Sequence, residues 1–185
     1  MKSLLFLALG VGLFVAPQKY TVKADAIYME PDTAAVQRLK GVTEIQVAPT
    51  KVSLQEWRDG EPIKDAVALP VELHRLVRDT ILQTKLRRSA TLRILGKDQR
   101  GTQPAAVSVT IVGTYDRDHK LTITIELSVR DHATVDRNRE RFLAEVYKSR
   151  ATIIKPSRAA LDRSLSDLID TFFEAWTTAN QISAE

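Results

Sequence analysis

Aspartate and histidine side chains gather in two short polar segments of the chain. Asp116, Asp118 and His119 lie in the first segment, and Asp131 and His132 lie in the second. Such groups serve as general acids and bases in hydrolases, or as oxygen and imidazole ligands of a metal ion. A metal site needs three or more ligands at a defined spacing, and Asp is also common in turns, where its carboxylate accepts backbone N–H groups. We predict no metal site and keep a periplasmic hydrolase built from these turn residues as the alternative function.

Nucleophilic and phosphate-binding motifs do not occur in the sequence. The chain has no cysteine, no G-x-S-x-G or S-x-x-K motif, and no glycine spacing of the Walker or dinucleotide-binding type. His74 lies between apolar positions of a predicted helix, where a structural role is the simpler interpretation. We therefore predict no catalytic residue, no cofactor and no enzymatic activity.

Positive charges gather between residues 85 and 100. Arg87 and Arg88 come at the end of a predicted helix, and Arg93 and Lys97 follow in the next strand and turn. Cations at a helix C-terminus interact favourably with the helix dipole, which is the structural interpretation. The functional interpretation is an anionic partner: a phospholipid or lipopolysaccharide head group, or an acidic protein face.

A tryptophan in the long polar segment 50–67 is a second candidate for partner binding. Trp57 is followed by Arg-Asp-Gly, and aromatic residues are enriched among the energetically dominant residues of interfaces. We expect Trp57→Ala, or a combined Arg87→Glu and Arg88→Glu change, to weaken partner binding and to leave thermal stability nearly unchanged.

The elements that must position these residues follow from the hydrophobic periodicity. Period-two patterns predict strands near 43–47, 91–95, 107–115, 121–130 and 142–154, although the last segment also fits a helix face. Apolar residues at three- and four-residue steps predict helices near 69–89 and 157–180. The predicted fold is α+β: a two-layer sandwich in the order β-α-β-β-β-β-α, with an antiparallel sheet of four or five strands and two amphipathic helices packed on one face. The predicted core comprises Leu73, Val77, Ile81, Val109, Ile111, Ile123, Ile125, Leu165, Ile169 and Phe172.

Length and charge limit the classes of function. The 185 residues suit one domain, and 44% of them are apolar, enough for a hydrophobic core. The net charge of +4 includes +2 from residues 1–26, so the remaining 24 basic and 22 acidic residues leave only +2. A nearly neutral domain argues against a nucleic-acid binder.

The first 26 residues resemble a secretory signal. Met1-Lys2-Ser3 begins the chain, an apolar stretch runs from Leu4 to Ala16, and Ala24-Asp-Ala26 offers a small-x-small cleavage site. At about 1.5 Å per residue, the thirteen apolar residues span about 20 Å, less than the ~30 Å hydrocarbon core of a bilayer. We predict a cleaved signal peptide at 1–26, a lead-in segment at 27–40 and a single domain at 41–182, with an uncleaved anchor as the alternative. The protein is then periplasmic or otherwise extracytoplasmic, without a spanning segment after cleavage.

The order of the predicted elements resembles that of small α+β proteins of the Gram-negative envelope. The segments IQVAP at 45–49, LSVRD at 127–131 and LAE at 143–145, with a final amphipathic helix, carry this resemblance. Lipopolysaccharide-assembly lipoproteins, penicillin-binding-protein activators and auxiliary proteins of ABC-type transporters share that order. Those proteins are usually lipoproteins, whereas this chain lacks a cysteine for lipid attachment. The resemblance implies a non-enzymatic accessory or assembly role with an envelope protein as partner.

Overall fold

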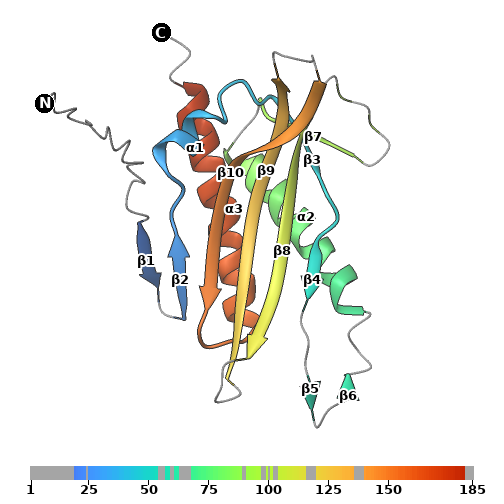
Figure 1. Ribbon diagram of the computed structural model, residues 1–185, viewed down its shortest axis with the longest axis vertical. Helices are drawn as coiled ribbons and strands as arrows, with labels where there is room; N and C mark the ends of the chain where they lie inside the picture. The colour runs from blue at the N-terminus through green and yellow to red at the C-terminus, as the bar shows by residue number, and fades with distance from the viewer. Residues whose placement is uncertain are drawn as a thin grey trace, which may run out of the picture.

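The computed structural model describes residues 19–23, 25–53, 57–58, 61–62, 68–88, 91–96, 99, 101, 104–115, 120–135 and 140–181. Within these ranges it places residues 57–58, 61–62, 68–70, 115, 132–135, 140–143 and 181 by their backbone alone. A large twisted sheet lies against long helices (Figure 1).

The sheet has eight strands and contains both parallel and antiparallel pairs. Its order is β1-β2-β10-β9-β8-β3-β7, and β4 also pairs with β8. The strands of this sheet are β1 (Tyr20–Lys23), β2 (Ala26–Met29), β3 (Glu44–Val47), β4 (Lys51–Ser53), β7 (Arg93–Leu95), β8 (Ala105–Tyr115), β9 (Leu121–Val135) and β10 (Glu140–Ile153). A separate short hairpin consists of β5 (Trp57–Arg58) and β6 (Glu61–Pro62).

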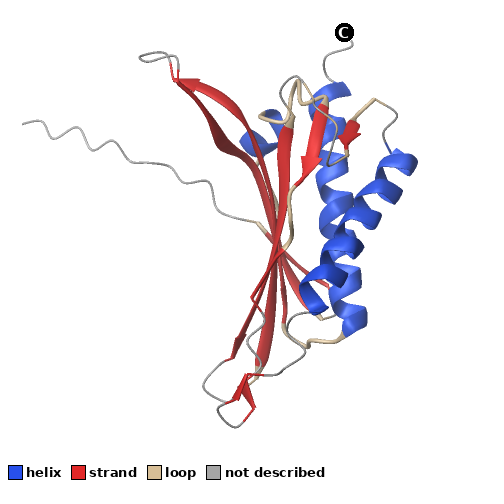
Figure 2. Ribbon diagram, turned by 90° about the vertical axis from the view of Figure 1, so that its right-hand side faces the viewer, coloured by secondary structure: helices blue, strands red, loops and turns tan. Residues whose placement is uncertain are grey.

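Three helices complete the described fold: α1 (Thr33–Gln37), α2 (Ala68–Arg88) and α3 (Arg158–Gln181). The two long helices lie on one side of the sheet, and in the described part of the chain the other face carries no helix (Figure 2). Ser157 begins α3, because its hydroxyl accepts the backbone N–H of Ala160 at 3.1 Å.

The predicted antiparallel sheet of four or five strands with two helices was wrong in strand number, sheet type and helix number. A helix joins β3 to β7, and a strand–helix–strand connection within one sheet makes the two strands parallel. β3 and β4 both pair in parallel with β8, at Ala105–Val107 and at Thr110–Val112. β3 and β4 therefore pair with successive segments of the same strand. The pairing is interrupted at Pro49, which has no N–H to donate.

The additional strands lie in segments for which no strand was predicted. β1 falls inside the segment predicted as signal peptide, β2 begins at its last residue, and β4 falls inside the long polar connection. Each has only three or four residues, too few to display a period-two pattern. The strand interpretation of 142–154 was correct, since β10 covers Glu140–Ile153 and pairs with β9 along most of its length.

The core lies between the inner face of the sheet and the two long helices. All ten residues predicted for the core are buried. Phe172 on α3 packs edge-on against Tyr147 on β10 and against Phe173, with ring centroids 5.6 and 5.3 Å apart. The sequence therefore identified the inward faces of the long elements correctly.

A candidate binding surface on helix α2

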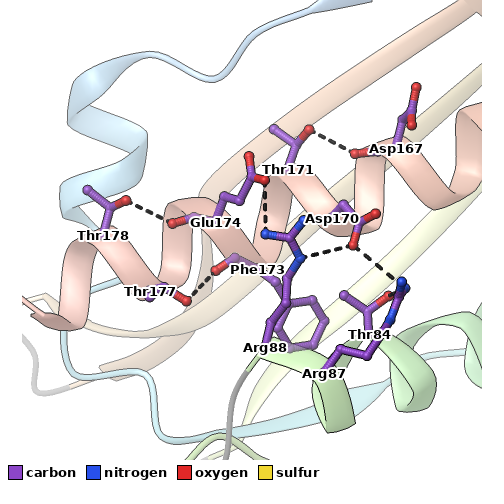
Figure 3. Close-up of polar contacts among 10 residues, drawn as sticks. All are labelled: Thr84, Arg87, Arg88, Asp167, Asp170, Thr171, Phe173, Glu174, Thr177 and Thr178. Atoms are coloured by element: carbon purple, nitrogen blue, oxygen red, sulfur yellow. Dashed lines mark hydrogen bonds and ion pairs between the residues drawn. The ribbon is translucent and has the colours of Figure 1, made fainter.

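Three of the four cations predicted as a partner site, Arg87, Arg88 and Arg93, contact acidic residues of the chain itself. Arg88 lies between two acids of α3, with Nε 3.2 Å from Asp170 Oδ1 and Nη1 3.0 Å from Glu174 Oε1 (Figure 3). Arg87 donates to Thr84 Oγ1 at 3.2 Å and lies 3.9 Å from Asp170 Oδ1. These contacts join the C-terminal end of α2 to α3, so both arginines have a structural role. Changing both to Glu is therefore expected to lower stability, contrary to the expectation from the sequence.

The other predicted partner-binding residues lie elsewhere. Arg93 on β7 contacts Glu44 on the neighbouring β3 at 2.6 Å. Trp57 is placed by its backbone in β5, opposite Pro62 of β6, and this hairpin extends beyond the end of β4 (Figure 1). Lys97 lies outside the described residues. The structure thus does not bring Arg87, Arg88 and Arg93 together as one free cationic surface.

The residues of the alternative hydrolase are largely outside the described part of the chain. Asp116, Asp118 and His119 lie outside it, and the backbone of His132 is in β9, opposite Leu143 of β10. His74 is half-buried on α2, where Nδ1 lies 3.3 Å from the backbone N of Thr50. In the described residues no three His, Asp or Glu side chains gather as a metal site would require.

A polar cleft of about 190 Å³ opens where β10 bulges. The pairing with β9 shifts between Glu145 and Tyr147, and Arg38 Nε donates to the carbonyl of the intervening Val146 at 3.1 Å. Lys148 contacts Glu145 at 3.4 Å, and it also reaches Glu126 at 3.2 Å. The cleft is lined by Met29, Asp32, Ala35, Arg38, Glu145, Val146, Tyr147 and Lys148. The charged groups of the cleft are paired with one another or with the backbone, and we assign it no ligand.

Glu126 is the centre of an ionic cluster on the face of the sheet opposite the helices. Arg150 Nη2 donates to Glu126 Oε2 at 2.7 Å, and Lys148 Nζ lies 3.2 Å from Oε1. Partial burial raises the pKa of Glu126, but the hydrogen bonds from Arg150 and Lys148 outweigh it and hold the pKa below its usual value. The cluster bridges β9 and β10 and therefore stabilises the sheet.

The outward face of α2 carries exposed aliphatic side chains. Val71, Leu82 and Leu86 are exposed there, by 72%, 36% and 80% respectively. Single exposed aliphatic residues are ordinary on protein surfaces, but these three share one line along one helix. Leu73, Val77 and Ile81 are buried as predicted, and Leu86 points away from them.

Three cations lie on the same line. At about 100° per residue, six side chains fall within roughly 100° of the helix circumference: Val71, Arg75, Arg78, Leu82, Lys85 and Leu86. We call them the α2 stripe. Within the described part of the chain, Arg75, Arg78 and Lys85 form no ion pair. The stripe contains no acidic residue, since Asp79 and Glu72 lie at its border. The sequence prediction missed this surface because the apolar side chains of an amphipathic helix were expected to be buried. The position of Val71, Leu82 and Leu86 on one line of the helix was the available signal.

No helix in the described part of the chain is both long and apolar enough to cross a membrane.

No protein-family model matches the chain. No curated protein matches it either. Among solved structures the chain is similar to a PelC dodecamer from Paraburkholderia phytofirmans, at 10% identity and a TM-score of 0.38. That alignment covers 79% of this chain and 94% of the other. A likeness this weak carries no argument about fold or function.

Proposed function

We propose that the protein is an exported, non-enzymatic accessory or assembly protein of the cell envelope that acts by binding. The α2 stripe is the contact surface in this proposal. Export is supported by the signal-like pattern of residues 1–26. The α2 stripe consists of aliphatic and cationic side chains, which suit binding.

One observation carries the proposal: the α2 stripe holds exposed aliphatic side chains between cations that have no acidic partner in the described chain. Arg87 and Arg88, which directly follow Leu86 on the same helix, are bound to α3 through Asp170 and Glu174. The same helix therefore uses its last arginines for packing and leaves Arg75 and Arg78 exposed to solvent. Unpaired cations beside exposed aliphatic residues favour an anionic, partly apolar partner.

The alternative hydrolase receives no comparable support. Asp116, Asp118 and His119 are outside the described residues, and no described contact favours a site built from them. The binding role is therefore the function that the described residues support best.

The position of signal cleavage bears on which surface the exported protein presents. Cleavage after Ala26 stays a prediction, and it would remove β1 from the edge of the sheet. It would also remove Lys23, which lies 3.3 Å from Asp167, and Asp25, which lies 3.5 Å from Arg163. N-terminal sequencing of the protein recovered from the envelope fraction determines the cleavage site.

Site-specific photo-cross-linking in intact cells tests the proposed function. A photoreactive residue at position 82 or 86 should form adducts with an envelope component. The matched position is 124, since Thr124 lies on the sheet face opposite the helices, between the buried Ile123 and Ile125. Absence of any adduct at 82 and 86, or adducts at 124 alone, would contradict the proposal.

A further inference from the structure

We propose that the α2 stripe lies against the surface of an anionic lipid membrane. This inference rests on the proposed function, because it names the partner of the same surface. Three features of the stripe support it: the spacing of the aliphatic residues along α2, the positive charge, and the absence of acidic and aromatic residues.

The aliphatic residues are spread along the helix and do not form one compact patch. Val71 and Leu86 are fifteen residues apart, about 22 Å along the axis at about 1.5 Å per residue, with Leu82 between them. A helix that lies in the plane of a bilayer buries its apolar side chains at the boundary of head groups and acyl chains. The core of a protein interface is instead a contiguous patch enriched in aromatic residues, and the α2 stripe has none.

The charge of the stripe fits a negative surface. Arg75, Arg78 and Lys85 lie between Val71 and Leu86 on the same line of the helix, so that cations and apolar groups face the same plane. Long basic side chains can reach past their own apolar stems to place the charge among phosphate groups. Because the cations form no ion pair within the described chain, their charge is available to phospholipid phosphates.

The arginines that follow the stripe show why it ends where it does. Arg87 and Arg88 turn toward α3 and contact Asp170 and Glu174 (Figure 3). Their charges are largely neutralised within the fold, and they would contribute little to a lipid contact. Helix α2 thus carries two sets of cations: Arg87 and Arg88 contact α3, and the three cations of the α2 stripe are available to lipid.

Vesicle co-sedimentation with the full chain tests this inference. The vesicles are phosphatidylcholine alone, or phosphatidylcholine with 30% phosphatidylglycerol as the anionic probe. We expect binding to the anionic vesicles to fall about 25-fold for Arg75→Gln with Arg78→Gln, at roughly fivefold per cation. Leu82→Ser with Leu86→Ser should lower binding at least tenfold. Every variant keeps the same N-terminal segment, so that the substituted side chains are the only difference between the chains compared.

Matched substitutions elsewhere on the surface serve as controls. Lys40→Gln with Lys51→Gln removes two exposed cations outside the stripe, and Val22→Ser removes an exposed aliphatic residue. Both controls should bind within twofold of the unmodified chain. Raising the salt concentration from 0.1 to 0.5 M should weaken binding of the unmodified chain to anionic vesicles, a readout that needs no variant.

Three outcomes would overturn the inference: equal binding to both kinds of vesicle, unchanged binding of the stripe variants, or controls that lose as much binding as the stripe variants. Its failure is distinguishable from failure of the proposed function. Protein adducts at position 82 without lipid binding would reject the membrane and keep the binding role. No adduct at 82 or 86 would reject the binding role itself.

Discussion

The indole N–H of Trp176, near the end of α3, donates to the backbone carbonyl of Val42 at 2.6 Å. Both residues are buried, and 134 positions separate them in the chain. One hydrogen bond thus fixes the last helix to the segment that leads into β3. An unpaired buried carbonyl costs about 1–3 kcal/mol.

We therefore expect Trp176→Phe to lower the free energy of unfolding by about 2–4 kcal/mol, through loss of this bond and of indole volume. Urea unfolding followed by circular dichroism measures the effect. Thr178→Val on the exposed side of the same helix is the control and should change stability by less than about 0.5 kcal/mol. A Trp176→Phe protein as stable as the unmodified chain would show that the Val42 contact contributes nothing.

Replacing Phe172 by alanine should cost about 3–5 kcal/mol, because its ring is enclosed between the sheet and α3 beside Tyr147 and Phe173. Phe172→Leu keeps most of the volume and should cost less than about 1.5 kcal/mol. Equilibrium unfolding in urea distinguishes the two. Equal losses for both variants would argue against a volume effect at this position.

The lowered pKa of Glu126 makes the stability of the protein depend on pH in the acid range. Because the folded-state pKa lies below the ordinary value of 4.5, the ionised carboxylate stabilises the fold above that value. This stabilisation is lost as the pH falls through the folded-state pKa. We expect Glu126→Gln to be less stable than the unmodified chain at pH 7, and the difference between them to shrink below about pH 4.

Thermal unfolding between pH 3 and pH 7 measures this difference. The matched control is Glu72→Gln, an exposed position on α2 with no ion pair in the described chain, and it should change stability little at pH 7. A difference between the Glu126→Gln protein and the unmodified chain that stays constant down to pH 3 would show that Arg150 and Lys148 do not favour the ionised form.

Charge reversal separates the two sets of cations on α2. Arg88→Glu places a like charge beside Glu174 and beside Asp170, whose Oδ1 is shielded from solvent, and should lower stability by roughly 1–2 kcal/mol. Arg78→Glu has no such neighbour in the described chain and should change stability by less than about 0.5 kcal/mol. Differential scanning calorimetry compares them. Equal melting temperatures for the two variants would contradict the assignment of Arg88 to packing.

Removal of the N-terminal hairpin strand should destabilise the domain. A chain that begins at Ile27 lacks β1 and loses the contacts of Lys23 with Asp167 and with the Tyr28 ring, whose centroid is 5.0 Å away. We expect it to be less stable than a chain that begins at Lys19 by about 1–3 kcal/mol. Parallel urea titrations of the two chains decide this. Equal midpoints would mean that β1 is dispensable and that cleavage after Ala26 costs no stability.

The long elements were predictable because their hydrophobic pattern repeats many times. α2, α3, β8, β9 and β10 each have at least eleven residues, and burial follows their period. The parallel pairing was also available in the sequence, since a helix between two strands favours parallel neighbours. That signal was overlooked for β3 and β7, and the sheet type was therefore predicted wrongly.

The short strands and the partners of the charged residues were not predictable in this way. β1 and β4 gain their stability from the neighbouring strands β2 and β8, and their own sequences carry little signal. Likewise, the charge of Arg88 is visible in the sequence, but its neutralisation depends on which turn of α3 packs against α2. Sequence can therefore count the cations on a helix, whereas only the packing shows which of them remain unpaired.

The contacts that join the two ends of the chain also set the order in which it can fold. Tyr28 donates its hydroxyl hydrogen bond to Ser164 across 136 positions, and Gly41 donates its backbone N–H to Asn180 across 139. Closing loops of this length precedes any gain from the contacts, and such topologies fold slowly. Tyr28 on β2 and Gly41 after α1 therefore lack these two partners until α3 has been synthesised. Completion of the domain is therefore expected to follow synthesis of α3, the last helix of the described fold.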